Sequence, residues 1–356
     1  MAENCNSTNI SMCNFTCNSK DYPHEESKLL LIAVYSIVSI VGLPANCLTA
    51  ILTLVQICRG NSLAIYLFGL SLCELMYLST LPLWIIYVQN NRSWNIGEHS
   101  CRVTGYIFFC NVYISILLLC CISVDRYMAV VYPLRSRGLR NQRIAMGVTL
   151  VLFVVVAITY SPVFFDRNIQ TSNMSTCFES PLNPRLANFN IVRFLVGFII
   201  PFAILIFMNY KIFQSIKISY SLSPHQKSKV KYLAIAIISI FVVCFAPYHF
   251  VLLVRAIRFH WHPNEYCDFE KKTYTLSTVF LCLSTANSVA DPFIYVLATE
   301  NTKHEIRQAF RVMGGRFLNN SKTDSNKPDS TQKTPVDPSE VHTEDRSIHS
   351  TERGVT

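Results

Sequence analysis

Residues 103–134 read VTGYIFFCNVYISILLLCCISVDRYMAVVYPL, and this stretch decides the fold. No charged residue occurs from Val103 to Val124, and the pair Asp125–Arg126 follows directly. A run of about 20 apolar residues is long enough to cross a lipid bilayer as a helix. The sequence therefore predicts a membrane-spanning helix with a carboxylate and a guanidinium at one end.

The composition extends this prediction to the whole chain. Of 356 residues, 51% are hydrophobic and 15% are charged, whereas about 25% of the residues in a soluble domain are charged. Lipid offers the backbone no hydrogen bonds, so long apolar spans must be helices, and a β-barrel would show alternating hydrophobicity instead. We expect an all-α membrane protein, a bundle of seven transmembrane helices at Leu29–Cys58, Asn61–Asn91, Val103–Val124, Ile144–Phe165, Phe194–Tyr210, Tyr232–Val254 and Thr273–Thr299.

Basic residues between the spans predict the orientation. Two connecting loops carry only positive charge, at Arg135, Arg137, Arg140, Arg143 and at Lys211, Lys217, Lys227, Lys229, Lys231. Such loops face the cytoplasm by the positive-inside rule, so we expect a plasma-membrane protein with an extracellular N-terminus. The net charge of +9 then reflects topology, and we expect no nucleic-acid partner. Sequons that fit this orientation lie at Asn6, Asn9, Asn14, Asn91 and Asn173.

The regions outside the bundle have their own character. We divide the chain into an extracellular glycosylated segment (1–27), the bundle (28–299), a short amphipathic helix on the membrane surface (300–317) and a tail (318–356). The tail is rich in Ser, Thr, Asp and Pro and poor in apolar residues, which predicts disorder. We expect it to be the target of receptor kinases and arrestin.

Several short motifs occur in order along the predicted helices. They are GLPAN ending at Asn46, DRYMAVVYPL from Asp125, CFAP ending at Pro247 and DPFIY from Asp291. With them, the chain resembles rhodopsin-like (class A) G-protein-coupled receptors over about residues 28–317. The segments SLCELMY, CFAPYH and STANSVADPFIYVLAT are similar to the proton-sensing and lysolipid-responsive subgroup. The resemblance implies a receptor that passes an extracellular signal, either protons or an oxidised free fatty acid or lysophospholipid, to heterotrimeric G proteins.

The same resemblance assigns a switch at the end of the third helix. It implies that Arg126 pairs with Asp125 at rest and extends toward Tyr295 when the sixth helix swings out. Lys227 stands where some relatives have an acid, so the resting lock should depend on Asp125 alone. The alternative is a cation that merely snorkels to the interface. The resemblance adds further switch and coupling residues, namely Tyr127, Leu134, Phe245, Pro247 and Pro292.

Glu74 and Asp291 are carboxylates inside the second and seventh spans, where ionisable groups are costly. In the family fold these positions face one another. Two neighbouring carboxylates in a low dielectric resist ionising together and titrate as a unit. The pair could act as a proton switch, with a sodium ion favouring the resting form, or it could share one proton permanently and be structural. The remaining members of this expected polar core are Asn111, Ser115, Asn287 and Ser288.

Candidate ligand and proton sites lie nearer the outer side. Arg193, at the outer start of the fifth helix, could anchor a lipid carboxylate, with Arg255 as a second anchor; the alternative for each is a paired or snorkelling charge. His249 could titrate near neutral pH or be a satisfied core histidine. His260 and His262 could sense protons among outer acids or simply lie on a solvated surface.

The resemblance also implies a disulfide between Cys101 and Cys177 and suggests one between Cys17 and Cys267, which leaves Cys5 and Cys13 as a guess. No Cys or His cluster has the spacing of metal ligands, so we expect no metal cofactor beyond the sodium ion. The competing function is a seven-helix transporter or pump, but the chain shows no internal repeat and its Lys271 and Lys272 lie only at the edge of the last span. No nucleophile, base and orienter converge, so we expect no enzyme activity.

Overall fold

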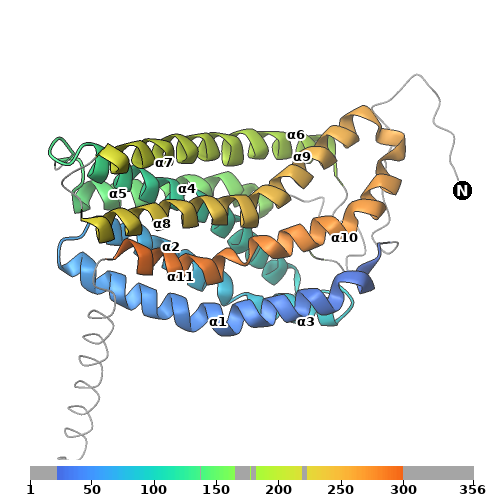
Figure 1. Cartoon of the computed structure of the whole chain (residues 1–356). Coiled ribbons are helices and arrows are strands. Elements are labelled where there is room, and N and C mark those ends of the chain that lie inside the picture. Colours follow the sequence, from blue (N-terminus) through green and yellow to red (C-terminus); the bar gives the residue numbers. More distant parts are fainter. Residues whose placement is uncertain (1–21, 137, 165–176, 178–181, 219–222, 300–356) are drawn as a thin grey trace, which may run out of the picture. The chain divides into compact units, whose positions relative to one another are not determined.

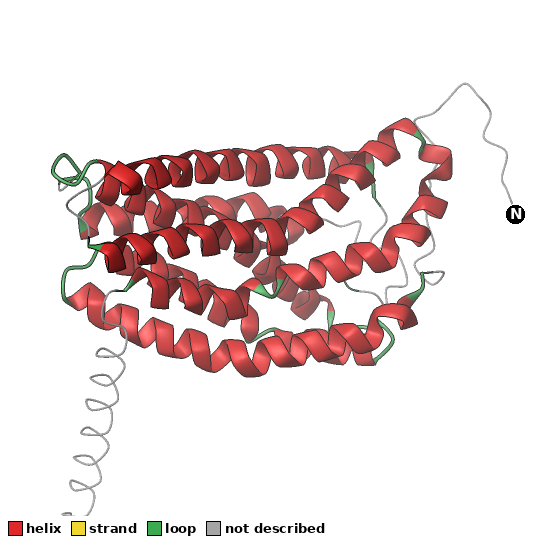
Figure 2. Ribbon diagram, in the orientation of Figure 1, coloured by secondary structure: helices red, strands yellow, loops and turns green. Residues whose placement is uncertain are grey.

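The computed structural model describes residues 22–136, 138–164, 177, 182–218 and 223–299. These residues form helices and connecting loops, and no strand occurs among them (Figure 2). Seven helical segments are long and apolar enough to cross a membrane, which confirms the predicted fold class. Two compact units divide the chain at residues 306 and 307, and the second unit lies outside the described residues, as do the predicted surface helix and tail.

The seven spans are built from straight and broken helices (Figure 1). The unbroken spans are α1 (His24–Cys58), α4 (Glu98–Val131) and α5 (Gln142–Tyr160), which a 3₁₀ turn extends over Ser161–Phe164. The second span is α2 (Leu63–Leu78) with α3 (Leu81–Gln89), and the seventh is α10 (Tyr266–Ser284) with α11 (Asn287–Ala298). The fifth joins α6 (Pro184–Phe194) to α7 (Ile200–Ile218), and the sixth joins α8 (Pro224–Ile240) to α9 (Ala246–Trp261).

π-helical turns connect the two halves of the fifth and sixth spans. They cover Leu195–Ile199 and Phe241–Phe245. A π turn inserts one extra residue into a helix and rotates the side chains that follow it, and such turns are frequent at functional sites. Pro247 follows the second π turn and cannot donate a backbone hydrogen bond, so the sixth span is open to bending there.

Polar side chains cap the N-terminal ends of three helices, α5, α6 and α8. The Asn141 carboxamide oxygen accepts a hydrogen bond from Ile144 N at 2.8 Å, and the Asn183 carboxamide caps α6 in the same way. Ser223 and Gln226 form a capping box at the start of α8. The long α4 has no such side-chain cap, and it continues beyond Asp125–Arg126 to Val131.

The third span, α4, lies at the centre of the bundle. It packs against α2, α5, α7 and α8, and its residues Ile116, Leu118 and Leu119 have no exposed surface. α5 is mostly exposed along its length, as expected for a helix at the lipid boundary. A central α4 can hold side chains that reach from one end of the bundle to the other.

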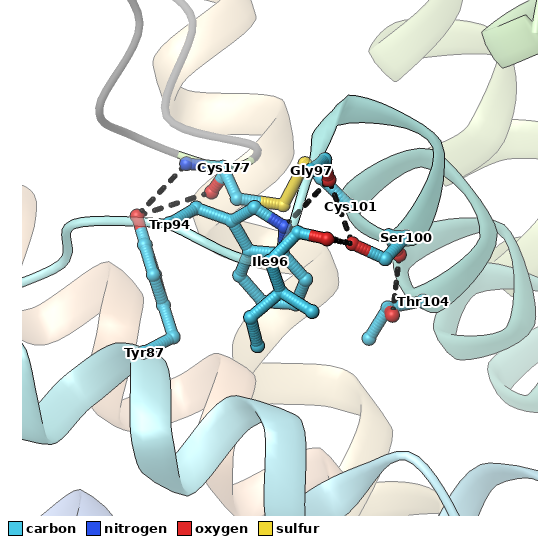
Figure 3. Close-up of a disulfide and its surroundings, with 8 residues drawn as sticks. All are labelled: Tyr87, Trp94, Ile96, Gly97, Ser100, Cys101, Thr104 and Cys177. Atoms are coloured by element: carbon cyan, nitrogen blue, oxygen red, sulfur yellow. Dashed lines mark hydrogen bonds between the residues drawn. A yellow bond between two sulfur atoms is a disulfide. The ribbon is translucent and has the colours of Figure 1, made fainter.

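A disulfide joins Cys101, in the first turn of α4, to Cys177, with a Cα–Cα distance of 5.8 Å. The Tyr87 hydroxyl donates to Cys177 O at 3.2 Å and accepts from Cys177 N at 3.1 Å, which ties the loop to α3 (Figure 3). The Trp94 indole N–H donates to Gly97 O at 2.9 Å and closes the turn before α4. We call this end of the bundle the disulfide end and the opposite one the Asp125 end.

Other features predicted for the disulfide end lie only partly among the described residues. Cys267 is disulfide-bonded, but its predicted partner Cys17 lies outside the described residues, together with Cys5 and Cys13. Asn91 is exposed in the loop after α3, where its Oδ1 accepts a hydrogen bond from Lys28 Nζ at 2.5 Å. The remaining sequons, at Asn6, Asn9, Asn14 and Asn173, lie outside the described residues.

Candidate functional site

Arg193 is a buried cation in the last turn of α6, only 7% exposed. Its Nε donates to the Tyr113 hydroxyl of α4 at 3.1 Å and its Nη2 to the Tyr248 hydroxyl of α9 at 3.3 Å. Its Nη1 donates to Asn190 Oδ1, one turn earlier, at 3.2 Å. Three different spans therefore position the guanidinium.

Aromatic rings surround the same guanidinium. Its carbon Cζ lies 4.8 Å from the ring centre of Phe109 and 5.4 Å from that of Tyr113. Two more rings stand at 5.7 and 5.8 Å, within the range of cation–π attraction. We call the five side chains that enclose the cation the Arg193 cage: Phe109, Tyr113, Tyr160, Phe189 and Tyr248.

The cage neutralises the charge of Arg193 only in part. A guanidinium has five N–H donors, and Arg193 uses three of them in the bonds above. Among the described residues, no acid forms an ion pair with it. A buried charge without a counter-ion is costly, and a planar guanidinium matches a carboxylate or phosphate well. The two unused donors of Arg193 therefore suit an anionic group chemically.

The π turn of the fifth span fixes how closely α6 approaches α4. Gly197 lies in this turn, and a Cβ atom built on it would stand 2.5 Å from Cε1 of the Tyr113 ring. Only a residue without a side chain permits this approach. The turn and its glycine thus bring Arg193 within hydrogen-bonding distance of Tyr113.

His249 on α9 lies next to Tyr113 of the Arg193 cage and has no exposed surface. Its Nδ1 is 2.7 Å from Phe245 O, and its Nε2 is 3.0 Å from the Tyr113 hydroxyl. A backbone carbonyl can only accept, so Nδ1 carries the proton and Nε2 accepts from Tyr113. Both nitrogens are engaged next to a cation, which favours the satisfied core histidine over the titrating one.

The polar core forms around Glu74 on α2. The Glu74 carboxylate accepts hydrogen bonds from Ser115 Oγ at 2.7 Å, Asn287 Nδ2 at 2.8 Å and Ser288 Oγ at 2.5 Å. Asp291, one turn further along α11, is close enough to interact electrostatically with Glu74. The helix break at Thr285–Ala286 directly precedes Asn287 and Ser288, and both side chains are buried.

Asp291 itself is poorly satisfied. Both of its carboxylate oxygens are buried and form no hydrogen bond of normal geometry with the described residues, although Asp291 lies close enough to Glu74 and Asn287 to interact with them; Oδ1 of Asn287 is likewise unbonded. Asn111 donates to the Cys73 thiol at 3.7 Å, so it joins the edge of the cluster. Orphaned oxygens of this kind suit a proton or a hard cation, which prefers oxygen ligands.

At the Asp125 end, the predicted ion pair is present. Arg126 Nη2 lies 2.7 Å from Asp125 Oδ2, and its Nε lies 3.2 Å from the same oxygen. Arg140, from the loop after α4, also binds this carboxylate, with Nε 3.1 Å from Oδ1. Among the described residues, Asp125 is the acid that pairs with Arg126, and a second cation, which was not predicted, shares its carboxylate.

Tyr295 on α11 is engaged by helix α1. The Gln56 carboxamide donates to the Tyr295 hydroxyl at 3.1 Å and to Thr299 Oγ1 at 3.2 Å. Lys229 on α8 donates to Thr299 O at 2.8 Å and so links the sixth and seventh spans. These contacts close the Asp125 end around Tyr295.

The remaining switch residues occupy distinct environments. Leu134 is 82% exposed just after α4, and the Tyr127 ring packs edge-on against Tyr132 at 5.7 Å. Phe245 is fully buried at the end of the π turn, directly before the Pro247 region. Pro292 lies within α11, beside Asp291.

The sequence matches the family described as 7 transmembrane receptor (rhodopsin family) over residues 45–295. The chain belongs to this family. Its motifs and its seven spans are thus those of a G-protein-coupled receptor. Receptors of this family are multi-pass proteins of the plasma membrane that couple to G proteins and respond to a ligand, and the transporter alternative is not favoured.

Individual receptors that are similar to the chain indicate its subgroup within the family. The chain is 56% identical over 287 residues, 80% of its length and 74% of the relative's, to probable G-protein coupled receptor 132 of Mus musculus. It is 52% identical over 295 residues to the Homo sapiens protein of that name, covering 82% and 76%. It is also 35% identical over 301 residues to G-protein coupled receptor 68 of Bos taurus, covering 84% and 82%. The subgroup indicated by the motifs is confirmed, and these relatives are receptors rather than enzymes.

Arg255 has an acid partner that the sequence did not reveal. It forms an ion pair with Glu270 on α10 through Nη2, and its Nε lies 3.1 Å from Glu270 Oε2. The Tyr266 hydroxyl donates to the same carboxylate at 2.7 Å. Arg255 therefore joins α9 to α10 and is less available to a ligand than Arg193.

The histidines at the end of α9 lie away from the receptor core. His260 and His262 are exposed, and Trp261 between them is 75% exposed. His260 touches the Phe259 ring edge-on at 5.7 Å. The exposure favours the solvated surface over a tight proton-sensing cluster.

The sequence did not identify several residues that contact the switch at the Asp125 end or the Arg193 cage. Arg140 and Lys229 counted only as loop charges, and Gln56 carried no motif. The contact of the Tyr113 hydroxyl with Arg193 was not predicted either. Arg140 and Asp125 are 15 residues apart, and the helical repeat predicts side-chain contacts only at spacings of three or four residues.

Proposed function

We propose that this G-protein-coupled receptor responds to an anionic lipid, an oxidised free fatty acid, whose carboxylate binds Arg193. The observation that carries the proposal is a buried guanidinium with unused donors and no acid partner among the described residues. The aromatic lining of the cage suits the apolar part of a lipid near its head group. A lysophospholipid would present a phosphate to the same cation.

The carboxylate can be tested with ricinoleic acid, a hydroxylated fatty acid, against methyl ricinoleate. The receptor in lipid nanodiscs would be assayed for nucleotide exchange on a heterotrimeric G protein. We expect the acid to activate and the uncharged ester not to. Arg193→Gln should abolish the response, whereas Arg185→Gln, which removes an exposed arginine of the same helix, should leave it intact. Equal potency of acid and ester would refute the proposal.

A lysophospholipid that activates while the acid does not would shift the ligand class but keep the anion at Arg193. Loss of that response in Arg193→Gln would identify the phosphate as the group recognised. The Arg193→Lys variant separates the requirement for a positive charge from the requirement for a planar guanidinium. It keeps the charge and loses the planar fork, so a carboxylate that binds in bidentate fashion should be strongly weakened.

A second stimulus, protons, is favoured by one observation: the orphaned oxygens of Asp291 beside Glu74. We propose that proton uptake by this pair accompanies activation, and that the resting form holds a sodium ion. Asp291, Glu74 and the Asn287 carboxamide oxygen would be its ligands, because they are hard oxygen donors. The ion would supply the positive charge that allows both carboxylates to be ionised.

The proton response would be measured as nucleotide exchange from about pH 8 to pH 6, a window on both sides of physiological pH, without added lipid. A response that disappears in Glu74→Gln with Asp291→Asn, while Arg193→Gln keeps it, would support the pair. Sodium chloride should raise the unfolding temperature more than choline chloride does, and the double variant should lose this difference. A pH response that survives in the double variant would exclude the pair as the sensor.

The orientation and the regulatory partners are further proposals. An extracellular N-terminus rests on the basic loops and the sequons, and kinase and arrestin binding rests on the composition of residues 318–356. Glycosidase treatment of surface-labelled receptor, and mass spectrometry of the stimulated tail, would test them separately.

A further inference from the structure

From the Arg193 cage and the sixth span, we infer that Tyr113 is a positioning residue that transmits ligand binding at Arg193 to the backbone of Phe245. Three hydrogen bonds run in series: Arg193 to Tyr113 at 3.1 Å, Tyr113 to His249 at 3.0 Å, and His249 to Phe245 O at 2.7 Å. We call them the Tyr113 relay. The inference rests on the proposed role of Arg193 as the ligand anchor.

The relay permits a single arrangement of protons. Phe245 O can only accept, so His249 donates through Nδ1 and accepts through Nε2. Tyr113 must therefore give its hydroxyl proton to His249, and its oxygen accepts from Arg193 Nε. Hydrogen bonds in such a chain polarise one another, so a change at the cation is felt at the far end.

The relay ends where the sixth span can bend. Phe245 is the last residue of the π turn, and Pro247 lies two residues beyond it. Because proline has no N–H and the π turn shifts the backbone pairing, helical hydrogen bonding is weakened here. His249 adds a side-chain bond to the Phe245 carbonyl at this weak point, and the buried Phe245 ring packs against Phe241.

The middle of the relay is held firmly. The Tyr113 ring stacks on Tyr160 at 5.3 Å and meets the His249 ring edge-on at 5.6 Å. Phe198 stacks on the other side of His249 at 4.9 Å. Since the rings cannot shift freely, a carboxylate that draws the Arg193 N–H groups toward itself weakens the bond to Tyr113. The hydroxyl then binds His249 differently, and the restraint on Phe245 changes.

The test separates affinity from signalling. Tyr113→Phe removes the hydroxyl and keeps the ring, so binding of ricinoleic acid is measured first and nucleotide exchange is then compared at concentrations that saturate each receptor. The variant loses the bonds to Arg193 and to His249, so ligand-induced nucleotide exchange should fall by at least about fivefold, the factor for a single lost hydrogen bond. Tyr106→Phe is the matched control: its hydroxyl on the same helix donates to Ala157 O at 2.9 Å, outside the cage. A wild-type response in Tyr113→Phe overturns the inference.

A ligand-free measurement distinguishes failure of the relay from failure of the proposed ligand. Tyr113→Phe and His249→Phe should each change basal nucleotide exchange, and the double variant should match a single one because both break the same chain. Additive effects overturn the relay even if the acid binds. Non-additive effects, in a receptor that does not bind the acid, leave the relay standing and exclude the fatty acid. The ¹⁵N shift of His249 Nε2 should change in Tyr113→Phe and not in Tyr106→Phe.

Discussion

Arg140 binds the same Asp125 carboxylate that holds Arg126, with Arg140 Nε 3.1 Å from Oδ1 and Arg126 Nη2 2.7 Å from Oδ2. Asp125 is 3% exposed, and one negative charge therefore serves two cations. Each cation weakens the hold of the other, and Asp125 keeps a partner when Arg126 leaves. The sharing lowers the free-energy difference between the resting and the released position of Arg126.

This relationship predicts that Arg140→Gln strengthens the resting pair. Basal nucleotide exchange should fall by about twofold to fivefold, the range of one partly exposed ion pair. Asp125→Asn should act in the opposite direction and raise basal exchange, because Arg126 loses its counter-ion. Both would be measured at equal surface expression.

The control for Arg140→Gln is Arg143→Gln, which removes an exposed arginine three residues later that has no ion pair among the described residues. It should leave basal exchange unchanged. If Arg140→Gln instead raised basal exchange, as Asp125→Asn should, Arg140 would be part of the lock and not a competitor for it.

Lys229 makes a contact between the sixth and seventh spans that must break if the sixth helix moves outward. Its ammonium lies 2.8 Å from Thr299 O, at the C-terminal end of α11, where carbonyl groups attract a cation. Lys229→Met should raise basal exchange by about threefold, in line with one charge-assisted hydrogen bond that is partly exposed. The measurement is constitutive activation of the G protein in nanodiscs.

Lys231→Met provides the matched change, since Lys231 is an exposed lysine on the same helix. It alters the charge of α8 equally without touching Thr299. Equal basal activity in the two variants would mean that total charge, and not the contact with Thr299, sets the resting state.

The sequence predicted the seven spans because charge-free runs are strong signals in a membrane protein. It placed Glu74 next to Asp291 only through the family motifs, since no periodicity links two helices so distant along the chain. The structure also shows where each helix ends, which the pattern of apolar residues does not predict. α4 passes Asp125 because helix ends follow caps and backbone geometry rather than the last apolar residue.

The same limit applies to the site. Arg193 could be singled out as a cation in an apolar span, but its lack of an acid partner among the described residues depends on three helices meeting. Arg255 has the same sequence signature, a cation near the end of a span, and it is paired with Glu270. Only the packing shows that Arg255 has an acid partner and that Arg193 has none among the described residues.

That pair yields a third prediction. Glu270→Gln leaves the Arg255 charge largely buried without its acid, so the free energy of unfolding should fall by about 2 kcal/mol, below the range for fully buried pairs because Arg255 keeps some exposure. Arg255→Gln with Glu270→Gln should be less damaging than Glu270→Gln alone, since no charge remains unpaired. Thermal unfolding of purified receptor would measure both.

The binding of ricinoleic acid supplies the control for this pair. If Arg255 is structural, the double variant should bind the acid as the wild type does. Loss of binding in a variant that remains folded would restore Arg255 as a ligand anchor.

Gly197→Ala tests the close approach that builds the cage. The new methyl group would stand 2.5 Å from one atom of the Tyr113 ring and 3.0 Å from the next, and stacking on Tyr160 prevents the ring from yielding. The free energy of unfolding should fall by about 1 to 3 kcal/mol, the usual effect of overpacking. Binding of ricinoleic acid should weaken as well, because Arg193 and Tyr113 are pushed apart.

Gly147→Ala is the control, since nothing lies within 4 Å of a Cβ added at that helical position. It should leave ligand binding unchanged and stabilise α5 by about 0.5 to 1 kcal/mol, as alanine does in place of glycine within a helix. A Gly197→Ala receptor that unfolds and binds like Gly147→Ala would mean that the π turn adjusts at little cost. The contact between α4 and the π turn at Gly197 would then not be what sets the distance from Arg193 to Tyr113.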